Sequence, residues 1–258
     1  MIRFCAHIGY QFTELPFFER FAAAAAQGFR AMEFPAPYAF VAQEIAGALR
    51  DNGLSYVQFA LPMGNASAGE KGIGCHPGRR AELDEGIALA IEYARLLDCK
   101  LVHAMAGILP ASLSREDGIR TYVEGLRHVA DRLMPHGITV LVEPINSVEV
   151  PGYLVDRPSL ALSILDACGR TNVRLLFDAY HSAVMGEDPV SFVRAHVARI
   201  GHVQVADHPG RHEPATGSID FPALFDALDT LGYPGWIGCE YKPLGRTVDG
   251  LGWRQRWR

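Results

Sequence analysis

The sequence lacks the features that would set it apart from ordinary globular proteins. Its five cysteines are an odd number and no CxxC pair occurs, which argues against a disulfide framework or a zinc knuckle. No stretch approaches the roughly 18 apolar residues of a membrane helix. The first ten residues, MIRFCAHIGY, hold no apolar run of signal-peptide length. We therefore expect reduced thiols, no membrane partner and a cytoplasmic location.

A basic excess is also missing. Lysine and arginine number 24 against 29 aspartates and glutamates, which gives a formal net charge of −5 and a pI of about 6.0. Nucleic-acid-binding surfaces are usually basic, so nucleic acid is not an expected partner. The chain is 49% hydrophobic, and its 258 residues are enough to build one large core. We expect a single domain over residues 1–258.

Short apolar runs alternate with longer helical patterns along the whole chain. The runs are mostly uninterrupted, as in parallel strands covered on both faces. Strands are predicted at 2–8, 31–34, 54–60, 100–104, 139–143, 173–178, 200–206 and 236–240. Helices are predicted between them, for instance at 15–27, 79–97 and 114–134. Eight such units predict an α/β fold, a single (β/α)₈ TIM barrel, with an open doubly wound sheet as the alternative.

The longest irregular stretch is predicted to wall or cover a pocket. It spans residues 62–78, after the third predicted strand, and includes GNASAGEKGIGCHPG. Loops of this length after a barrel strand are usually functional or mobile. We interpret it as a lid or pocket wall that contributes Glu70 to substrate binding, with an ordinary surface loop as the alternative.

Four successive predicted strands end on a side chain that can bind a metal. They lie in the segments ITVLVEPIN, VRLLFDAYH, IGHVQVAD and WIGCEYKP, and the side chains are Glu143, Asp178, Gln204 and Glu240. Each follows the previous one by about one βα unit. In a barrel this spacing gathers them at the C-terminal rim, where barrel active sites are built.

Three carboxylates at one rim need a compensating charge. A buried, unpaired carboxylate is costly, and several together repel one another. A divalent cation resolves the repulsion, and carboxylate and amide oxygens suit Mg²⁺ or Mn²⁺ better than a structural zinc. The alternative is a rim of salt bridges to Arg211 and Lys242.

The same two cationic residues are candidate anchors for an anionic substrate. Arg211, in ADHPGRHEPATG, offers a planar fork for a carboxylate, and Lys242 lies beside Glu240. An arginine in a surface loop is otherwise simply solvated.

Histidines and a further glutamate lie near strand ends. His181, three residues after Asp178, either orients a substrate oxygen or caps the next helix. Glu149 either binds a substrate hydroxyl or is solvated. His7 and His103 either line the pocket or are packed in the core.

These segments resemble the hydroxypyruvate isomerase family of the xylose isomerase-like barrel superfamily. The matching stretches run nearly end to end: RFCAHI, QGFRAMEF, AGEKGIGCHPGR, LVEPIN, PGYL, FDAYH, IGHVQVAD, EPATGSIDF and GWIGCEYKP. The resemblance implies metal ligation by Glu143, Asp178, Gln204 and Glu240, with Glu143 and Glu240 as the acid/base pair. Ketose epimerases of this superfamily usually have histidine in the place of Gln204, which favours the hydroxypyruvate isomerase branch.

The resemblance implies that the chain interconverts hydroxypyruvate and tartronate semialdehyde through an enediolate. The expected partners are thus a small 2-oxo or hydroxy acid and a divalent metal. The alternatives are a 2-oxo-tetronate isomerase, a ketose 3-epimerase, a DNA repair enzyme similar to endonuclease IV, and an inactive barrel that only binds. A homo-oligomer and the role of the tail GLGWRQRWR are left open.

Overall fold

The computed structural model describes residues 2–257. Nine strands in this range form one parallel sheet. The strand order is β3-β2-β1-β9-β8-β7-β6-β5-β4. The strands are β1 Arg3–His7, β2 Ala31–Glu33, β3 Ser55–Tyr56, β4 Gln58–Ala60, β5 Leu101–His103, β6 Thr139–Val142, β7 Val173–Asp178, β8 Ile200–Gln204 and β9 Trp236–Cys239.

The two end strands of this order are the halves of one predicted strand. The strand predicted at 54–60 is interrupted at Val57, so that β3 pairs with β2 and β4 pairs with β5. The amide of Val57 still donates to the carbonyl of Met32 at 2.9 Å, after which the chain turns to its other neighbour. The sheet therefore closes on itself, and the predicted (β/α)₈ barrel is confirmed.

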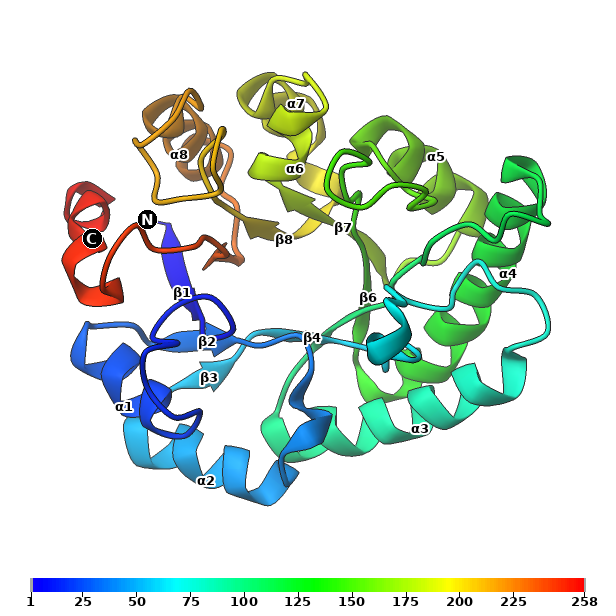
Figure 1. Ribbon diagram of the computed structural model, residues 1–258, viewed down its shortest axis with the longest axis horizontal. Helices are drawn as coiled ribbons and strands as arrows, with labels where there is room; N and C mark the ends of the chain where they lie inside the picture. The colour runs from blue at the N-terminus through cyan, green and yellow to red at the C-terminus, as the bar shows by residue number, and fades with distance from the viewer. Residues whose placement is uncertain (1, 258) are drawn as a thin grey trace.

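Helices surround the barrel (Figure 1). The α-helices are α1 Glu19–Ala26, α2 Ala42–Asn52, α3 Arg80–Leu97, α4 Arg115–Leu133, α5 Pro158–Cys168, α6 Ala179–Val184, α7 Pro189–His196 and α8 Phe221–Thr230. The 3₁₀ helices are η1 Pro37–Ala39, η2 Ala66–Ala68, η3 Met134–His136, η4 Val197–Arg199, η5 Thr247–Gly250 and η6 Gly252–Trp257. None in residues 2–257 combines the length and apolar character needed to cross a membrane.

Local sequence explains where several helices begin and end. Helix α4 begins where predicted, because the Ser114 side chain accepts the amide of Asp117 at 3.1 Å as an N-cap. Helix α1 begins at Glu19, four residues later than predicted. Leu15 precedes a proline and so disfavours helical torsions, and the residues between it and Glu19 form a turn. Helix α2 ends at Asn52, and Gly53 caps it with a φ of 61°, a conformation that favours glycine.

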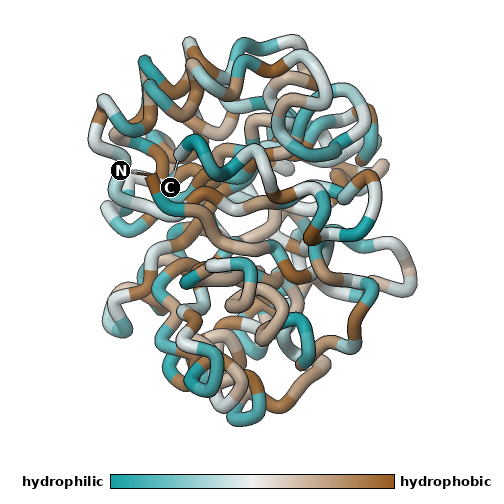
Figure 2. The backbone as a smooth tube through the Cα atoms, turned by 90° about the vertical axis from the view of Figure 1, so that its left-hand side faces the viewer, coloured by the Kyte–Doolittle hydropathy of each residue, from teal (hydrophilic) through white to brown (hydrophobic). Residues whose placement is uncertain are grey.

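Alternate residues of the strands face two different interiors. Phe4, Ala6 and Ile8 belong to the large cluster that also contains the buried helix residues. Cys5 forms a separate small cluster with Ala31 and Val57, on the opposite face of the sheet, inside the barrel. Figure 2 shows hydrophobic and hydrophilic residues alternating along the helices, as expected for elements that cover the sheet with one face only.

The C-terminal tail lies on its own barrel. The ring of Trp253 meets Phe4 edge-on at 5.0 Å and stacks near Phe225 at 5.8 Å. The guanidinium of Arg254 lies 3.7 Å from the ring centre of Phe29. The tail therefore covers the junction between β1 and α8. All five cysteines are buried free thiols.

Candidate active site

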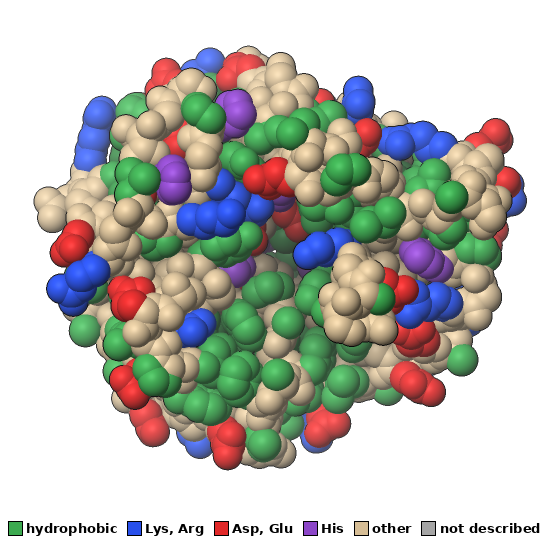
Figure 3. All heavy atoms as spheres, in the orientation of Figure 1, with side chains coloured by type: hydrophobic (Ala, Val, Ile, Leu, Met, Phe, Trp, Pro, Cys, Tyr) green, Lys and Arg blue, Asp and Glu red, His purple; other side chains and the backbone are tan. Residues whose placement is uncertain are grey.

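The four predicted ligands lie at the carboxyl ends of four neighbouring strands. Asp178 and Gln204 are the last residues of β7 and β8 and are direct partners in the sheet. Glu143 follows β6 and Glu240 follows β9. Figure 3, which has the orientation of Figure 1, shows acidic, basic and histidine side chains around a central hollow.

Arg211 is the cation among these carboxylates. Its Nη2 lies 3.3 Å from Glu240 Oε2 and 3.6 Å from Asp178 Oδ2, while Nη1 donates to Glu149 Oε2 at 3.3 Å. The guanidinium also lies near two tyrosine ring centres, 5.2 Å from that of Tyr10 and 5.0 Å from that of Tyr180. Arg211 is therefore fixed at the rim and not solvated as a surface arginine would be.

The loop after β8 is built to hold Arg211. The backbone of Arg211 has a φ of 59°, an uncommon conformation for a residue with a side chain. Its amide donates to the Asp207 carbonyl at 2.9 Å, and its carbonyl accepts the amide of Lys242 at 2.8 Å. The buried Asp207 carboxylate in turn accepts the amides of Gly217 and Ile219 at 2.8 and 3.1 Å. Asp207, the last residue of the QVAD segment, thus organises the loop.

Asn146 determines which nitrogen of His181 carries the proton. The oxygen of Asn146 accepts the amide of Glu149 at 2.8 Å, which turns its NH₂ toward His181 Nδ1 at 2.6 Å. Because Nδ1 accepts, the proton of the neutral ring lies on Nε2. This nitrogen lies 3.6 Å from Asp178 Oδ2 and 3.8 Å from Glu143 Oε1. His181 therefore presents an N–H donor to the site.

Burial gives the acids and the histidines opposite pKa shifts. Burial raises the pKa of Glu240 to about 8, although Arg211 opposes the rise. Burial, with the charges of Glu240 and Asp178, also raises the pKa of Glu143 well above its usual range. Burial lowers the pKa of His181 to about 3 and that of His7 to about 4. Near neutral pH the site therefore combines uncharged imidazoles with carboxyls that can carry protons.

The oxygens at this rim suit a hard divalent cation. Asp178 Oδ1 accepts the amide of Tyr180 at 2.8 Å, whereas its buried Oδ2 accepts no hydrogen bond. The buried Oε1 of Gln204 also lacks a hydrogen-bond partner. One ligand atom each from Glu143, Asp178 and His181 lie within 4.8 Å of one another. Asp178 Oδ2 lies 3.6 Å from nitrogens of Arg211 and His181, beyond hydrogen-bond distance. A cation would satisfy buried oxygens that accept no hydrogen bond.

A buried polar layer beneath the ligands was missed by the sequence analysis. Glu33, at the end of β2, is fully buried and accepts His202 Nε2 at 2.6 Å and Gln204 Nε2 at 2.8 Å. Burial alone would raise the pKa of Glu33, but its interactions with His202 hold it below the ordinary value, so it stays a carboxylate. The signal was present in QGFRAMEF, where an acid ends an apolar run just as it does in the four predicted ligands.

Of the remaining predicted substrate contacts, the histidines lie at the site and Lys242 lies on the surface. His7 Nε2 lies 3.5 Å from Glu240 Oε1, and His103 Nδ1 lies 3.4 Å from Glu143 Oε2, so both histidines border the catalytic candidates. The side chain of Lys242 is exposed and forms no ion pair within residues 2–257, so the predicted salt bridges involve Arg211 only.

The loop between β4 and α3 is attached to the barrel at several points. The amides of Gly74 and Cys75 donate to the carbonyls of Met105 and Ala106 at 3.3 and 2.7 Å. The Glu70 carboxylate pairs with Arg79 Nη1 at 2.6 Å within the same loop and contacts none of the four predicted ligands. A role for Glu70 in substrate binding therefore stays a prediction.

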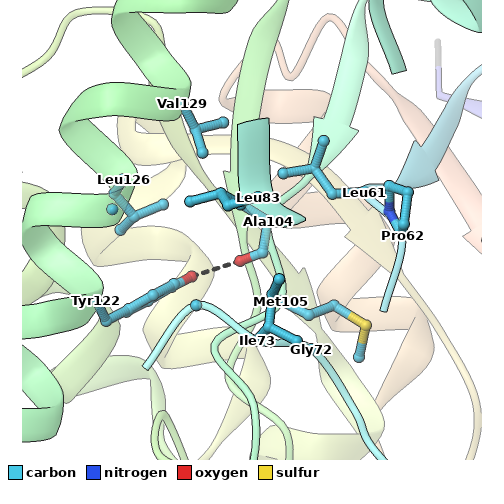
Figure 4. Close-up of a pocket in the computed structure, with 12 residues that line it drawn as sticks. Leu61, Pro62, Gly72, Ile73, Leu83, Ala104, Met105, Tyr122, Leu126 and Val129 are labelled. Atoms are coloured by element: carbon cyan, nitrogen blue, oxygen red, sulfur yellow. Dashed lines mark hydrogen bonds between the residues drawn. The ribbon is translucent and has the colours of Figure 1, made fainter. Parts of the chain in front are cut away.

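A small cavity beneath this loop is unsuited to a polar substrate. It measures about 20 Å³ and is lined mainly by apolar groups, among them Leu61, Ile73, Met105 and Leu126 (Figure 4). At its edge the hydroxyl of Tyr122 donates to the Ala104 carbonyl at 2.6 Å (Figure 4). That volume holds about one water molecule, which is too little room for a substrate.

Comparison with known proteins shows similarity over the whole chain. Residues 21–257 match the family model described as the xylose isomerase-like TIM barrel. A 2-oxo-tetronate isomerase from Cupriavidus necator is 42% identical, covering 98% of this chain and 97% of that protein. The hydroxypyruvate isomerase of Escherichia coli is 40% identical over 100% of both chains. A crystal structure of an AP endonuclease, family 2, from Brucella melitensis has a TM-score of 0.97 at 41% identity over 100% of both chains.

The raised carboxyl pKa values predict that the metal-free protein loses stability between about pH 7 and 8. In the unfolded chain a glutamate is already ionised there, so unfolding releases the proton that Glu240 holds up to about pH 8. The buried histidines act in the opposite direction, but only below their unfolded pKa of about 6.5. The unfolding midpoint, measured in EDTA, should therefore fall over this range.

Glu240→Gln removes the titrating group and should flatten the fall. Glu85→Gln, at an exposed glutamate of α3, is the matched control and should leave the slope unchanged. A slope that is equal in the wild type and Glu240→Gln would contradict the assignment.

Proposed function

Because this chain belongs to the xylose isomerase-like TIM-barrel family and to its hydroxypyruvate isomerase branch, we propose that it is a divalent-metal-dependent isomerase of hydroxypyruvate and tartronate semialdehyde. The observation that carries the proposal is the pair Glu143, which is buried, and Glu240, which is partly buried, with raised pKa values on two sides of one charged hollow. That the protein is an isomerase agrees with both curated relatives.

The proposed reaction moves one proton between adjacent carbons. Hydroxypyruvate loses a proton from its CH₂OH carbon and gains one at the neighbouring keto carbon, while the carbonyl and hydroxyl exchange places. The intermediate is an enediolate, and its negative charge makes the uncatalysed step slow. The site must therefore supply a base, an acid and a stabilising charge.

Glu143 and Glu240 are suited to the two proton transfers. They follow β6 and β9, which lie three places apart in the sheet order, so they reach the hollow from different sides. A carboxyl with a pKa near neutrality exchanges protons efficiently at physiological pH. One glutamate takes the proton from one carbon, and the other delivers a proton to the next.

The cation would be held by Glu143, Asp178, Gln204 and Glu240. When bound, Mg²⁺ or Mn²⁺ supplies positive charge that stabilises the negative charge developing on the substrate oxygens. The oxygens of Asp178 and Gln204 that are buried and accept no hydrogen bond support this donor set. Asp178 also caps α6 with its other oxygen, so its free oxygen has a fixed direction.

Arg211 and His181 are suited to bind the substrate. Arg211 Nε is buried without a hydrogen-bond partner, so part of the fork is free for a substrate carboxylate. His181 Nε2–H, fixed by Asn146, would donate to a substrate oxygen without competing as a base, because its pKa is about 3. Glu149 holds both Arg211 and the hydroxyl of Tyr180 and so orients this side of the site.

A 2-oxo-tetronate is the second candidate substrate. The relative of that name is 42% identical over nearly the full length of both chains. The proton shift is the same, because a 2-oxo-tetronate differs only by a CH₂OH group on the carbon that loses its proton. The two candidates therefore use the same glutamates and differ only in the room beside that carbon.

A substrate screen tests the proposal. The purified protein with Mn²⁺ should convert hydroxypyruvate, and EDTA should abolish the activity, with 2-oxo-tetronate and a ketose assayed in parallel. A higher kcat/KM for 2-oxo-tetronate would assign the second candidate. Cleavage of DNA at an abasic site, without isomerisation of either acid, would overturn the proposal.

Glu143→Gln and Glu240→Gln should each lower kcat by about 100-fold or more, because positioned acid/base catalysis typically contributes 10²–10⁴. Each variant keeps the size of the side chain and one oxygen ligand, so saturating Mn²⁺ separates proton transfer from metal binding. The double variant should be barely slower than either single one. A fully metallated Glu240→Gln enzyme that turns over at the wild-type rate would rule the mechanism out.

Arg211→Ala should raise KM for hydroxypyruvate more than about 25-fold, since a buried charge-assisted contact is worth about 2–5 kcal/mol. Arg211→Lys should recover only part of the loss, because an ammonium cannot form a planar fork. Lys242→Ala is the control with an exposed cation at the same rim. If KM rises in Lys242→Ala and not in Arg211→Ala, the carboxylate is bound by Lys242.

A further inference from the structure

We propose that Glu33 is a positioning residue that turns the Gln204 amide so that its oxygen faces the cation. The inference rests on the metal site of the proposed function and assigns to that site a residue from the opposite half of the barrel. Glu33 lies at the end of β2, which is separated from β8 by β1 and β9 in the sheet order.

An amide can serve as a ligand with one end only. Its oxygen carries the lone pairs that a cation needs, whereas its NH₂ group repels the cation. The two ends have nearly the same size, so packing alone does not choose between them. A ligand amide therefore needs a neighbour that accepts and cannot donate.

The Glu33 carboxylate is such a neighbour. Gln204 Nε2 donates to Glu33 Oε1 at 2.8 Å, and Gln204 Oε1 is left buried without a hydrogen-bond partner. An ionised carboxylate only accepts, so it binds the NH₂ end and excludes the oxygen end. The free oxygen of Gln204 thus lies on the side away from Glu33.

Glu33 is itself held from two sides. His202 Nε2 donates to its second oxygen at 2.6 Å, and the thiol of Cys5 donates weakly to the same oxygen at 3.8 Å. Glu33 and His202 are both fully buried. With one oxygen engaged by His202, the other is directed to Gln204.

A glycine in β9, which lies between β2 and β8 in the sheet order, leaves room for the Glu33 carboxylate. A Cβ atom at Gly238 of β9 would lie 2.2 Å from Glu33 Oε1 and 2.7 Å from its carboxyl carbon. Gly238 is also the direct sheet partner of Gln204. Any side chain at Gly238 would therefore push Glu33 away from the amide that it orients.

The variant Glu33→Gln tests orientation without changing size. His202 would still donate to the oxygen of the introduced amide, whose NH₂ would then face Gln204. Gln204 would have to turn its own oxygen inward to accept, and would present NH₂ to the cation. Glu33→Gln should therefore weaken Mn²⁺ binding about 10- to 100-fold, as is typical when the partner of a metal ligand is removed.

Two further comparisons separate orientation from loss of charge. In the Gln204→Ala background there is no amide to orient, so Glu33→Gln should weaken Mn²⁺ binding by less than about threefold there. The exchange Glu33→Gln with Gln204→Glu keeps the total charge and restores an oxygen facing the cation. This double variant should bind Mn²⁺ within about threefold of the wild type.

The measurement is Mn²⁺ affinity, by calorimetry and by electron paramagnetic resonance of the free ion, with the thermal midpoint of each variant as the folding check. An equal loss from Glu33→Gln in both backgrounds, or an exchange variant no better than Glu33→Gln alone, would overturn the positioning role and leave the metal site standing. If the wild type and Asp178→Ala bind Mn²⁺ equally, the metal site itself is wrong, and the inference fails with it.

Discussion

The site depends on how mutual repulsion among three carboxyl groups, two of them buried and one partly buried, is balanced. Glu143, Asp178 and Glu240 end three strands of one half of the barrel, and among residues 2–257 the Arg211 guanidinium is the one arginine or lysine side chain paired with any of them. One positive charge cannot neutralise three negative ones. Burial, together with this surplus of negative charge, raises the pKa values of Glu143 and Glu240. It also favours a cation, which would compete with those protons for the same oxygens.

The residues around the three carboxyl groups preserve the balance between their charges and that of Arg211. The histidines at the rim carry strongly lowered pKa values, so they add no positive charge near neutral pH that would replace the cation. Tyr10 and Tyr180 cover the guanidinium and shield Arg211 from water. Asp207 fixes the loop backbone that carries Arg211. Much of the polar network around the hollow thus serves to hold a few charges at defined positions.

The barrel could be predicted from sequence because its signal repeats. The same local pattern, an apolar run followed by a helix, occurs eight times. An acid or amide at the end of a buried strand departs from that pattern and is therefore easy to recognise. The interruption at Val57 could not be predicted, because it arises where one strand changes neighbours and not from any residue preference. The predicted beginning of α1, at Leu15, is four residues too early, because Leu15 precedes Pro16 and a turn comes before Glu19.

The residues that act through others were harder to find. The pairing of Glu33 with Gln204 joins residues 171 positions apart, and that of Asn146 with His181 joins residues 35 apart. Such contacts depend on how distant strands meet. A sequence pattern marks a polar residue in an apolar segment, but not the partner that gives it a role.

The chemistry is divided unequally between the two halves of the barrel. The last four strands, with the loops that follow them, supply the four predicted ligands, Arg211 and His181, whereas the first five contribute walls, His7 and His103. Replacing the first half of this chain by that of a related barrel could therefore change which substrate fits, while the residues proposed for proton transfer stay the same. Glu33 limits that freedom. A replacement for β2 would have to end in an acid as well. Otherwise Gln204, which lies in the half of the chain that is kept, would lose the partner that orients it.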